Sequence, residues 1–343
     1  MQWPVAIGID THKDRHVAVA CDRLGAQLGS CEIPATAAGY LHLWQWAVGL
    51  GEPRFGIEGS GSYGAGLASF LVVAGASVWE CERPQRCERR RGKSDLIDAA
   101  LAARRLLSGE GLSRLRGAGR REDLRLLLLE RRGVVAARTA ALNQLQAVLV
   151  TAPASLRERL QALAGEQLAE AVTRLRVRTA EPDTKTPLTV LRRLARRLGF
   201  LDKELGELER ELEAIVSDLC PELLGECGVG PVCAAQLVVS AGDPTRMRSE
   251  ASFAAHSGTS PVDASSGRQQ RHRLNKGGDR QLNRALHIIA LSRIRYHAQT
   301  AAYYASLLAR GKTTREARRC VKRALARYFY HRLRANPRLA LTP

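Results

Sequence analysis

Four acidic residues of this sequence could together bind divalent metal ions. Asp10 ends the apolar run "AIGID", and Glu58 ends the run "FGIE" before the small-residue loop "GSGSYG". Asp95 and Asp98 are three residues apart in "SDLIDAALAARRLLSG", which places both carboxylates on one face of a predicted helix. Each acid alone also has a structural explanation, because acids end strands in water and support helix N-termini.

Taken together, the four acids predict phosphoryl-transfer chemistry. A carboxylate in an apolar strand is costly unless it is paired, hydrogen-bonded or bound to a metal. Oxygen ligands suit Mg²⁺, and two such ions about 3.5–4 Å apart can stabilise both the attacking and the leaving oxygen of a phosphodiester. We therefore expect the four acids to be catalytic and to hold two Mg²⁺ ions. Glu80 and Glu82 are alternatives to Glu58, although the basic run after them favours salt bridges.

Apolar periodicity predicts the elements that must position these acids. Two alternating runs around a polar turn form a hairpin at residues 5–19, and Ser94 and Gly109 are natural ends for the helix that carries the acid pair. Further strands are expected near 27–33, 54–58 and 77–82, and helices near 40–48, 64–75 and 94–109. This order is that of a ribonuclease-H-like α/β fold, predicted for residues 1–115.

Residues 116–220 are predicted to form a helical segment with a coiled-coil seam. Apolar residues recur at alternating spacings of three and four residues over four heptads. The seam could pair with a second copy of the chain or fold back on the helix near 121–150, and the sequence favours neither. Its members are Leu191, Leu194, Leu198, Leu201, Leu205, Leu208, Leu212, Ile215 and Leu219.

Residues 221–343 are predicted to be a mostly helical, strongly basic domain. The chain has 343 residues and a net charge of +19, and residues 244–343 hold 21 Lys and Arg against 4 Asp and Glu. Such a segment is typical of nucleic-acid binding. A membrane surface is the alternative, but no run approaches about 18 apolar residues. Basic helices are expected at about 280–295 and 314–334.

Nucleic-acid contacts are expected at three places. One is the basic run beside the acid pair, and another is the C-terminal hundred residues. The third is the "GVGP" turn of a helix-hairpin-helix-like element at 223–242, whose glycines either admit a phosphate to backbone N–H groups or only shape the turn. The candidates are Arg89, Arg90, Arg91, Lys93, Gly228, Gly230, Arg268, Arg271, Arg273, Lys276, Arg280, Arg284, Arg318, Arg319, Lys322 and Arg323.

The cysteines argue against zinc and against a disulfide framework. Eight are scattered along the chain without a CxxC pair. Reduced, mostly structural thiols predict a cytoplasmic protein, and the N-terminus lacks a signal-peptide pattern.

In combination, several motifs resemble the insertion-sequence-one-ten family of DEDD transposases. They are "GIDTHKD", "GIEGSGSYG" and "RGKSDLIDAALAARRL", then "GVGP", "FAAHSGTSP", "SSG" and "NKGGDRQLNRAL", in the family's order over about residues 4–334. The resemblance implies a RuvC-like N-terminal domain that supplies the four acids, here Asp10, Glu58, Asp95 and Asp98. It also implies a coiled-coil segment and a C-terminal transposase domain with a serine nucleophile, which maps onto Ser266.

By this resemblance, Ser266 attacks a DNA phosphodiester and forms a covalent link to DNA. Without it, the serines of this loop read as turn formers. Ser265 is the alternative nucleophile, and the nearby Arg268, Arg271 and Arg273 could stabilise charge on phosphorus. The resemblance further implies donor and target DNA, a structured noncoding guide RNA, association with the bacterial nucleoid, and a homo-oligomer of two or more protomers, a dimer or a tetramer on DNA.

Two other functions stay open at the level of sequence. In a RuvC-like nuclease or junction resolvase, metal-activated water would attack and Ser266 would be idle. In a non-catalytic nucleic-acid-binding protein, the acids would only stabilise the fold.

Overall fold

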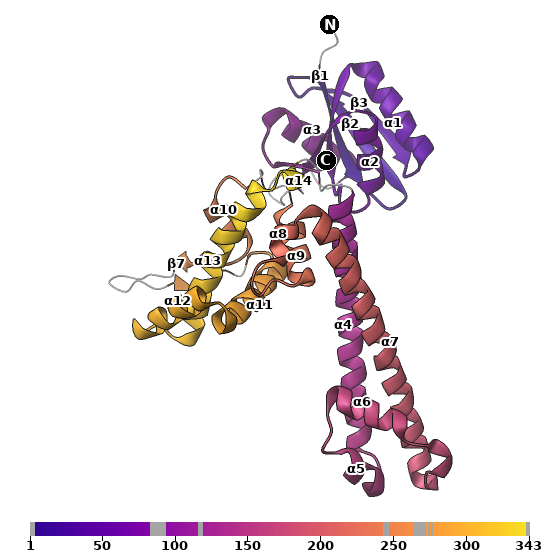
Figure 1. Ribbon diagram of the computed structural model, residues 1–343. Helices are drawn as coiled ribbons and strands as arrows, with labels where there is room; N and C mark the ends of the chain where they lie inside the picture. Colours follow the sequence, from indigo (N-terminus) through magenta and orange to yellow (C-terminus); the bar gives the residue numbers. More distant parts are fainter. Residues whose placement is uncertain are drawn as a thin grey trace. The chain divides into compact units, whose positions relative to one another are not determined.

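A computed structural model of the chain describes residues 4–82, 94–115, 119–242, 244, 247–263, 272–273, 275 and 277–340 (Figure 1). It contains two compact units, Met1–Ala118 and Gly119–Thr342. No helix within these described ranges is long and apolar enough to cross a membrane. None of the seven cysteines in them forms a disulfide.

The N-terminal unit is a mixed sheet in the order β3-β2-β1-β4-β5-β6. β1 is antiparallel to β2 and parallel to β4, β2 is antiparallel to β3, β4 is parallel to β5, and β5 is antiparallel to β6. The strands are β1 (Pro4–Thr11), β2 (Arg15–Cys21), β3 (Gln27–Pro34), β4 (Glu52–Glu58), β5 (Ser77–Cys81) and β6 (Leu112–Arg114). The sequence predicted the first five; β6 is too short to show a period.

Helices cover both faces of this sheet (Figure 1). Ile7 and Ile9 of β1 share one core with residues of α1 (Ala37–Leu50) and α2 (Ala65–Val73). On the other face, Ala6 packs with residues of β2 and of α3 (Asp95–Ser108). Because both faces are buried, β1 is apolar from Val5 to Ile9, and Asp10 and Thr11 follow at its end.

The ends of α3 are as the sequence predicted. The Ser94 hydroxyl accepts a hydrogen bond from Ile97 N at 3.3 Å, which caps the N-terminus. Gly109 ends the helix in the left-handed conformation, with φ of 73°. The position of Asp95 and Asp98 in the first turn of α3 is therefore determined by local sequence.

Two long helices of the second unit pack against each other, α4 (Arg120–Val150) and α7 (Pro182–Leu219) (Figure 1). α5 (Ala154–Leu160), α6 (Gly165–Arg174) and the 3₁₀ turn Val177–Thr179 connect them. Leu191 packs with Leu145 of α4, and Leu208 packs with Val134. The apolar seam of α7 is therefore buried on α4 of the same chain, which is the fold-back arrangement that the sequence left open.

A single core joins these two helices to the basic C-terminal part. It includes Leu124 and Leu212 together with Leu237, Ile289 and Phe329. The segments 116–220 and 221–343, predicted as separate domains, thus share one core within the described structure. The elements are α8 (Pro221–Leu224), α9 (Pro231–Ala241), α10 (Glu250–His256), β7 (Val262–Asp263), β8 (His272–Arg273), α11 (Arg280–Tyr296), α12 (Ala298–Ala309), α13 (Thr314–Ala335) and α14 (Pro337–Ala340).

Candidate functional site

Asp10 and Glu58 are neighbours at the ends of two parallel strands. The register pairs Gly8 with Gly56 and Asp10 with Glu58. Side chains alternate along a strand, and paired positions of parallel strands share a face. Both acids therefore lie on the face of the sheet that α3 covers.

Two glycines let α3 approach this face closely. A Cβ atom on Gly8 would lie 2.0 Å from Ala99 O and 2.1 Å from Ala103 N, and one on Gly56 would lie 2.9 Å from Leu106 Cγ. No side chain fits at position 8, so the backbone of α3 lies directly on β1. This contact brings the first turn of α3 to the end of β1, where Asp10 lies.

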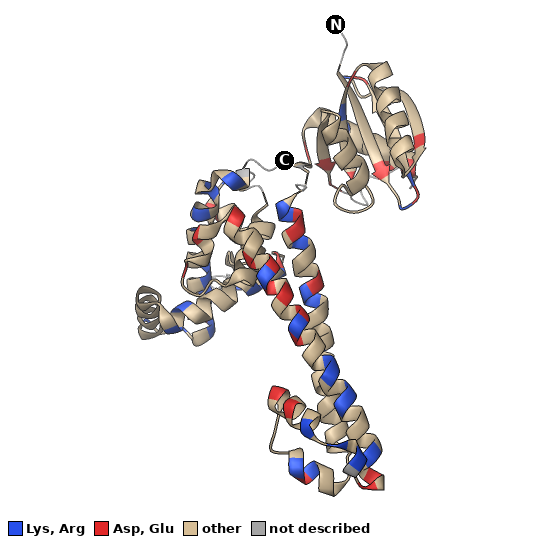
Figure 2. Cartoon of the chain, turned by 45° about the vertical axis from the view of Figure 1, so that its right-hand side comes forward, with Lys and Arg blue, Asp and Glu red and all other residues tan. Residues whose placement is uncertain are grey.

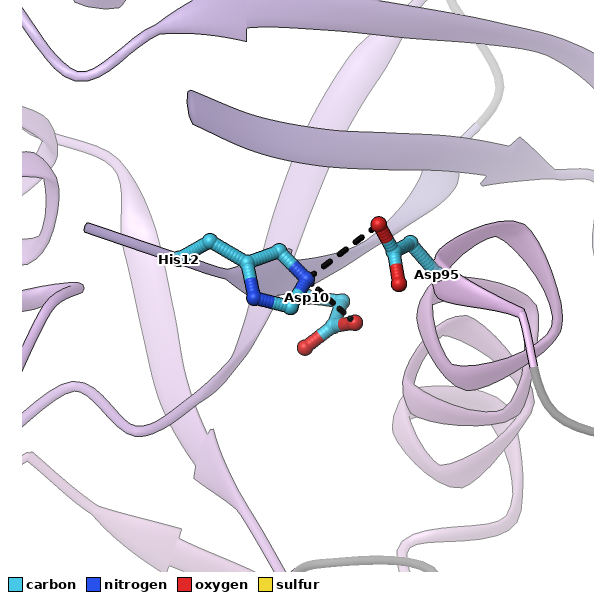
Figure 3. A group of neighbouring side chains, drawn as sticks. All are labelled: Asp10, His12 and Asp95. Atoms are coloured by element: carbon cyan, nitrogen blue, oxygen red, sulfur yellow. Dashed lines mark ion pairs between the residues drawn. The ribbon is translucent and has the colours of Figure 1, made fainter. Parts of the chain in front are cut away.

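Asp10, His12 and Asp95 form a group that could hold a metal ion. His12 Nε2 lies 3.3 Å from an oxygen of Asp10 and 3.3 Å from an oxygen of Asp95 (Figure 3). One ligand atom from each residue lies within 4.8 Å of the others. The side chains of Asp10, His12 and Asp95 are 11%, 45% and 34% exposed, so the group opens to solvent on one side.

The electrostatics of Asp10 fit a bound cation. Burial raises the pKa of Asp10; His12 offsets part of this effect, and the charges of Asp95 and Asp98 raise the pKa further. Asp98 itself is only 5% exposed. Asp95 and Asp98 thus repel the buried Asp10 carboxylate, and a divalent cation with oxygen ligands would relieve that repulsion. The residues present therefore fit a divalent metal.

Glu58 lies beside this group without belonging to it. Its backbone carbonyl accepts a hydrogen bond from Thr11 Oγ1 at 2.7 Å. Its carboxylate acts on Cys81 of the next strand, where burial, with help from Glu80 and Glu58 and against Arg105, raises the pKa of the thiol to about 12. The structure therefore brings Asp10, Asp95 and Asp98 together and leaves Glu58 at the adjacent strand end.

Glu80, the alternative to Glu58, has a different role. It pairs in register with Ile57, so it starts on the opposite face of the sheet from Glu58. Its carboxylate accepts hydrogen bonds from Gly59 N at 3.2 Å, from Ser60 N at 2.9 Å and from the Ser60 hydroxyl. Glu80 therefore anchors the loop that follows Glu58.

Two further residues, His12 and Arg15, reach this group in the structure and were not predicted from the sequence. His12 belongs to the polar turn of the predicted hairpin, and the period of two residues that orders the side chains of β1 ends before it, at Thr11. Arg15 pairs with Asp95 (Nη2–Oδ2 3.4 Å) and Glu32 (Nη1–Oε1 2.9 Å), and thereby links β2, β3 and α3. No local pattern announces a pair 80 residues apart.

Of the predicted nucleophile, basic-run and turn residues, the structure describes the two glycines of the turn, whereas nine others lie outside the described residues. Gly228 is described: it has φ of 78°, and a Cβ there would lie 2.8 Å from Ser292 Cβ, so the turn packs on α11. Gly230 is exposed as the N-cap of α9. Their contact with nucleic acid stays a prediction. The residues outside are Ser265, Ser266, Arg89, Arg90, Arg91, Lys93, Arg268, Arg271 and Lys276.

The described basic candidates lie in the helical unit. Figure 2 shows Lys and Arg spread over its helices, whereas the sheet unit is mostly uncharged. Arg280 and Arg284 are exposed on α11. Arg318 of α13 does not line a pocket with the others. The remaining four candidates line one pocket: Arg273, Arg319, Lys322 and Arg323.

An acidic candidate metal site on an α/β sheet, joined in one chain to a basic helical unit, is typical of enzymes that act on nucleic acid. Comparison with known families agrees. The family model "Transposase" of the IS110 DEDD type matches residues 7–152, and "Transposase IS116/IS110/IS902 family" matches residues 222–305. The chain belongs to the IS110 family of transposases.

Curated relatives are also insertion-element proteins. An uncharacterized 43.6 kDa protein of IS110 from Streptomyces coelicolor is 33% identical over 40% of this chain and 34% of its own length. The chain thus spans about a third of that relative. An IS116 protein of Streptomyces clavuligerus is 26% identical over 77% of each chain. An IS900 protein of Mycobacterium paratuberculosis is 25% identical over 91% of each chain.

Proposed function

We propose that this chain cleaves and exchanges DNA strands at a Mg²⁺ site formed by Asp10, Asp95 and Asp98, with Glu58 completing the ligand set. The observation that carries the proposal is the buried Asp10 carboxylate with Asp95 and Asp98 beside it, in a member of a transposase family. The strand order β3-β2-β1-β4-β5 supports a ribonuclease-H-like, RuvC-like domain.

The residues of the chain divide the work at this site. When bound, two Mg²⁺ ions would stabilise the attacking and the leaving oxygen of a phosphodiester. Asp10 of β1 and Asp98 of α3 are buried, and each would offer carboxylate oxygens to the metal. Asp95 and His12 offer more exposed atoms at the solvent side, where substrate would enter. Arg15, paired with Asp95, holds the first turn of α3 to the hairpin.

The nucleophile of this proposal is the hydroxyl of Ser266, with Ser265 as the alternative. The serine oxygen loses its proton and bonds to phosphorus, the bond from phosphorus to a deoxyribose oxygen breaks, and that oxygen takes up a proton. The hydroxyl of a second DNA end then loses its proton and bonds to the same phosphorus, the bond from phosphorus to the serine oxygen breaks, and the serine hydroxyl is restored by a proton. The match of residues 222–305 to the transposase family model, which spans both serines, supports this assignment.

The partners follow from the same proposal. Family membership supports DNA as substrate. A structured noncoding guide RNA, an oligomer of two or more protomers and a cytoplasmic, nucleoid-associated location complete it. Purification with co-bound RNA of defined sequence would support the RNA component, and recombination by protein freed of RNA would contradict it.

The experiment that tests the proposal is a denaturing gel of labelled DNA ends incubated with the full chain, co-purified RNA and Mg²⁺. Asp10→Asn and Asp98→Asn should strongly reduce strand cleavage, whereas Glu52→Gln, which changes an exposed acid at the start of β4, should not. Ser266→Ala should remove protein–DNA adducts. Cleavage that persists in Ser266→Ala without adducts would favour the nuclease or resolvase function, and activity in the aspartate variants would contradict the metal site.

A further inference from the structure

A basic pocket of about 760 Å³ lies within the helical unit. Its lining residues come from α10 and the turn after it, from β8, and from α12, α13 and the turn between them. Basic side chains supply much of the lining: Arg273, Lys312, Arg319, Lys322, Arg323 and Arg327.

The acids of this pocket already have partners. Glu250 pairs with Arg327 at 2.8 Å and with His331 at 3.3 Å. Glu316 accepts hydrogen bonds from Thr313 N at 2.9 Å and Thr313 Oγ1 at 2.8 Å in the capping box of α13. These bonds, and then Lys312 and Arg319, lower the pKa of Glu316, so this acid offsets part of the pocket's charge.

Three of the remaining cations form no salt bridge in the part of the chain that the structure describes. This holds for Arg319, Lys322 and Arg323, which lie within five residues of one another on α13. Two acids with partners of their own cannot neutralise the whole lining. The pocket therefore keeps a net positive charge.

Two of these cations have little contact with water, Lys322 over its whole side chain and Arg323 at one nitrogen. Lys322 is 9% exposed, and its Nζ donates a hydrogen bond of 2.8 Å to Asn283 Oδ1. Burial, and then the charge of Arg319, lowers the pKa of Lys322. Nη1 of Arg323 is buried and has no hydrogen-bond partner among the described residues. Since a buried cation is costly until an anion pairs with it, the pocket is suited to receive negative charge.

The turn after α10, which lines the pocket, is held by close contacts with residues 278 and 283. Asn283 Nδ2 donates to Ser257 O at 2.7 Å, so one side chain connects Lys322 to the turn after α10. A Cβ on Gly278 would lie 2.2 Å from Gly258 N, and Gly258 has φ of 64°. These residues belong to the motifs "HSGTSP" and "NKGGDRQLNRAL". The two motifs thus fix the position of Lys322.

We propose that this pocket binds a phosphodiester group of a nucleic-acid backbone, with Lys322, Arg319 and Arg323 as its cations. Guanidinium groups match phosphate oxygens in geometry and in charge. Ser260, which also lines the pocket, offers a hydroxyl donor. The inference rests on the proposed function for its substrate class, and it names the place where the helical unit binds the nucleic-acid backbone.

The test measures binding by fluorescence anisotropy with a labelled 30-base-pair DNA and with an RNA hairpin of equal charge, in EDTA over a series of salt concentrations. The pocket variant is Arg319→Ala with Arg323→Ala. The control is Arg310→Ala with Arg315→Ala, which removes the same charge from exposed positions outside the pocket lining. The pocket variant should bind about tenfold more weakly than the control, and its salt slope should fall by about one.

Loss of DNA binding, RNA binding or both supports the pocket and assigns its ligand. Equal affinities and slopes for the two double variants with both probes would overturn it. Lys322→Met keeps the apolar stem and should show the same loss, with folding checked by circular dichroism. Because the assay contains no metal, a chain that binds through this pocket and still cannot cleave DNA would refute the proposed function alone.

Discussion

The carboxylate site of the sheet unit and the basic pocket of the helical unit are built in the same way with opposite charge. Each gathers like charges where water is scarce, around Asp10 in one and Lys322 in the other. In each, glycine permits the close backbone contact that fixes the charges, at Gly8 on α3 and at Gly278 on Gly258. In both places a cluster of one sign of charge indicates a ligand of the opposite sign, a metal cation at Asp10 and a phosphate at Lys322.

A third buried charge cluster is neutralised by an ion pair within the chain itself. Glu226 and Arg293 are 16% and 6% exposed, and their charged atoms are 2.5 Å apart. Arg293 Nε also donates to Cys227 O at 2.8 Å, and the Tyr328 hydroxyl donates to Glu226. This pair holds α11 and α13 to the turn before α9 and needs no outside ion.

The largest expected effect is on strand cleavage, which depends on the carboxylate site, whereas metal-free DNA binding depends on the basic pocket. Asp98→Asn should reduce strand cleavage by about 1,000-fold, which is about 4 kcal/mol of activation free energy. Metal-free DNA affinity should not weaken, because the pocket cations are unchanged. Cleavage rates from quenched-flow gels and anisotropy in EDTA check the two readouts. Loss of metal-free affinity in this variant would break the separation.

The compensated pair should give the next largest effect. Glu226→Gln should lower the free energy of unfolding by about 3 kcal/mol at pH 7, because it leaves Arg293 buried without its charge partner. Urea denaturation measures this loss, and the control is Glu211→Gln, at an exposed position of α7. A loss below about 0.5 kcal/mol would show that the pair contributes little.

The same pair should also depend on pH. Burial raises the pKa of Glu226, but the Tyr328 hydrogen bond, Arg293 and Arg332 together bring it below its usual 4.5. A lowered acid pKa stabilises the fold above the unfolded value, and this contribution is lost as pH falls through the folded value. The stability difference between wild type and Glu226→Gln should therefore shrink below pH 4.5.

The close contact of α3 with β1 should give an effect of about 1–3 kcal/mol. Gly8→Ala forces a methyl group into the helix backbone and should destabilise the sheet unit by that amount. It should also weaken Mg²⁺ binding, because Asp95 and Asp98 move away from Asp10. The control is Gly49→Ala on α1, where a Cβ meets nothing within 4 Å. Urea unfolding and calorimetric Mg²⁺ titration measure both effects, and an unchanged stability would contradict the contact.

The smallest expected effect concerns His12. His12→Ala should weaken Mn²⁺ binding about tenfold, or about 1.4 kcal/mol, and Mg²⁺ binding less, because imidazole suits Mn²⁺ better than Mg²⁺. Calorimetric titration with each metal provides the comparison, and Asp10→Asn should weaken both. An equal loss for both metals in His12→Ala would mean that His12 positions the aspartates and does not ligate.

Local sequence determined the sheet unit well, because its signals lie within each element. Ser94 and Gly109 mark both ends of α3, and the predicted strands coincide with β1 to β5. The order of these elements was enough to place Asp10 near Asp98. It did not show that His12 joins them, because the turn after β1 has no repeat from which a side-chain direction could be read.

Tertiary contacts decided what local sequence could not. The apolar seam of α7 is compatible with any apolar partner, and only the structure shows that it packs on α4. Lys322 resembles every other basic residue of α13 until Asn283, 39 residues earlier, is placed against it. The strands β7 and β8 have two residues each, too few for a pattern.

The packing of α7 on α4 has a consequence for how copies of the chain could meet. Leu191, Leu198 and Leu212 are each at most 2% exposed, so the repeat that looks like a dimerisation zipper is already used. A second copy cannot be joined through these leucines unless α7 first leaves α4. Two copies that keep this helical pair intact would therefore have to meet through other residues.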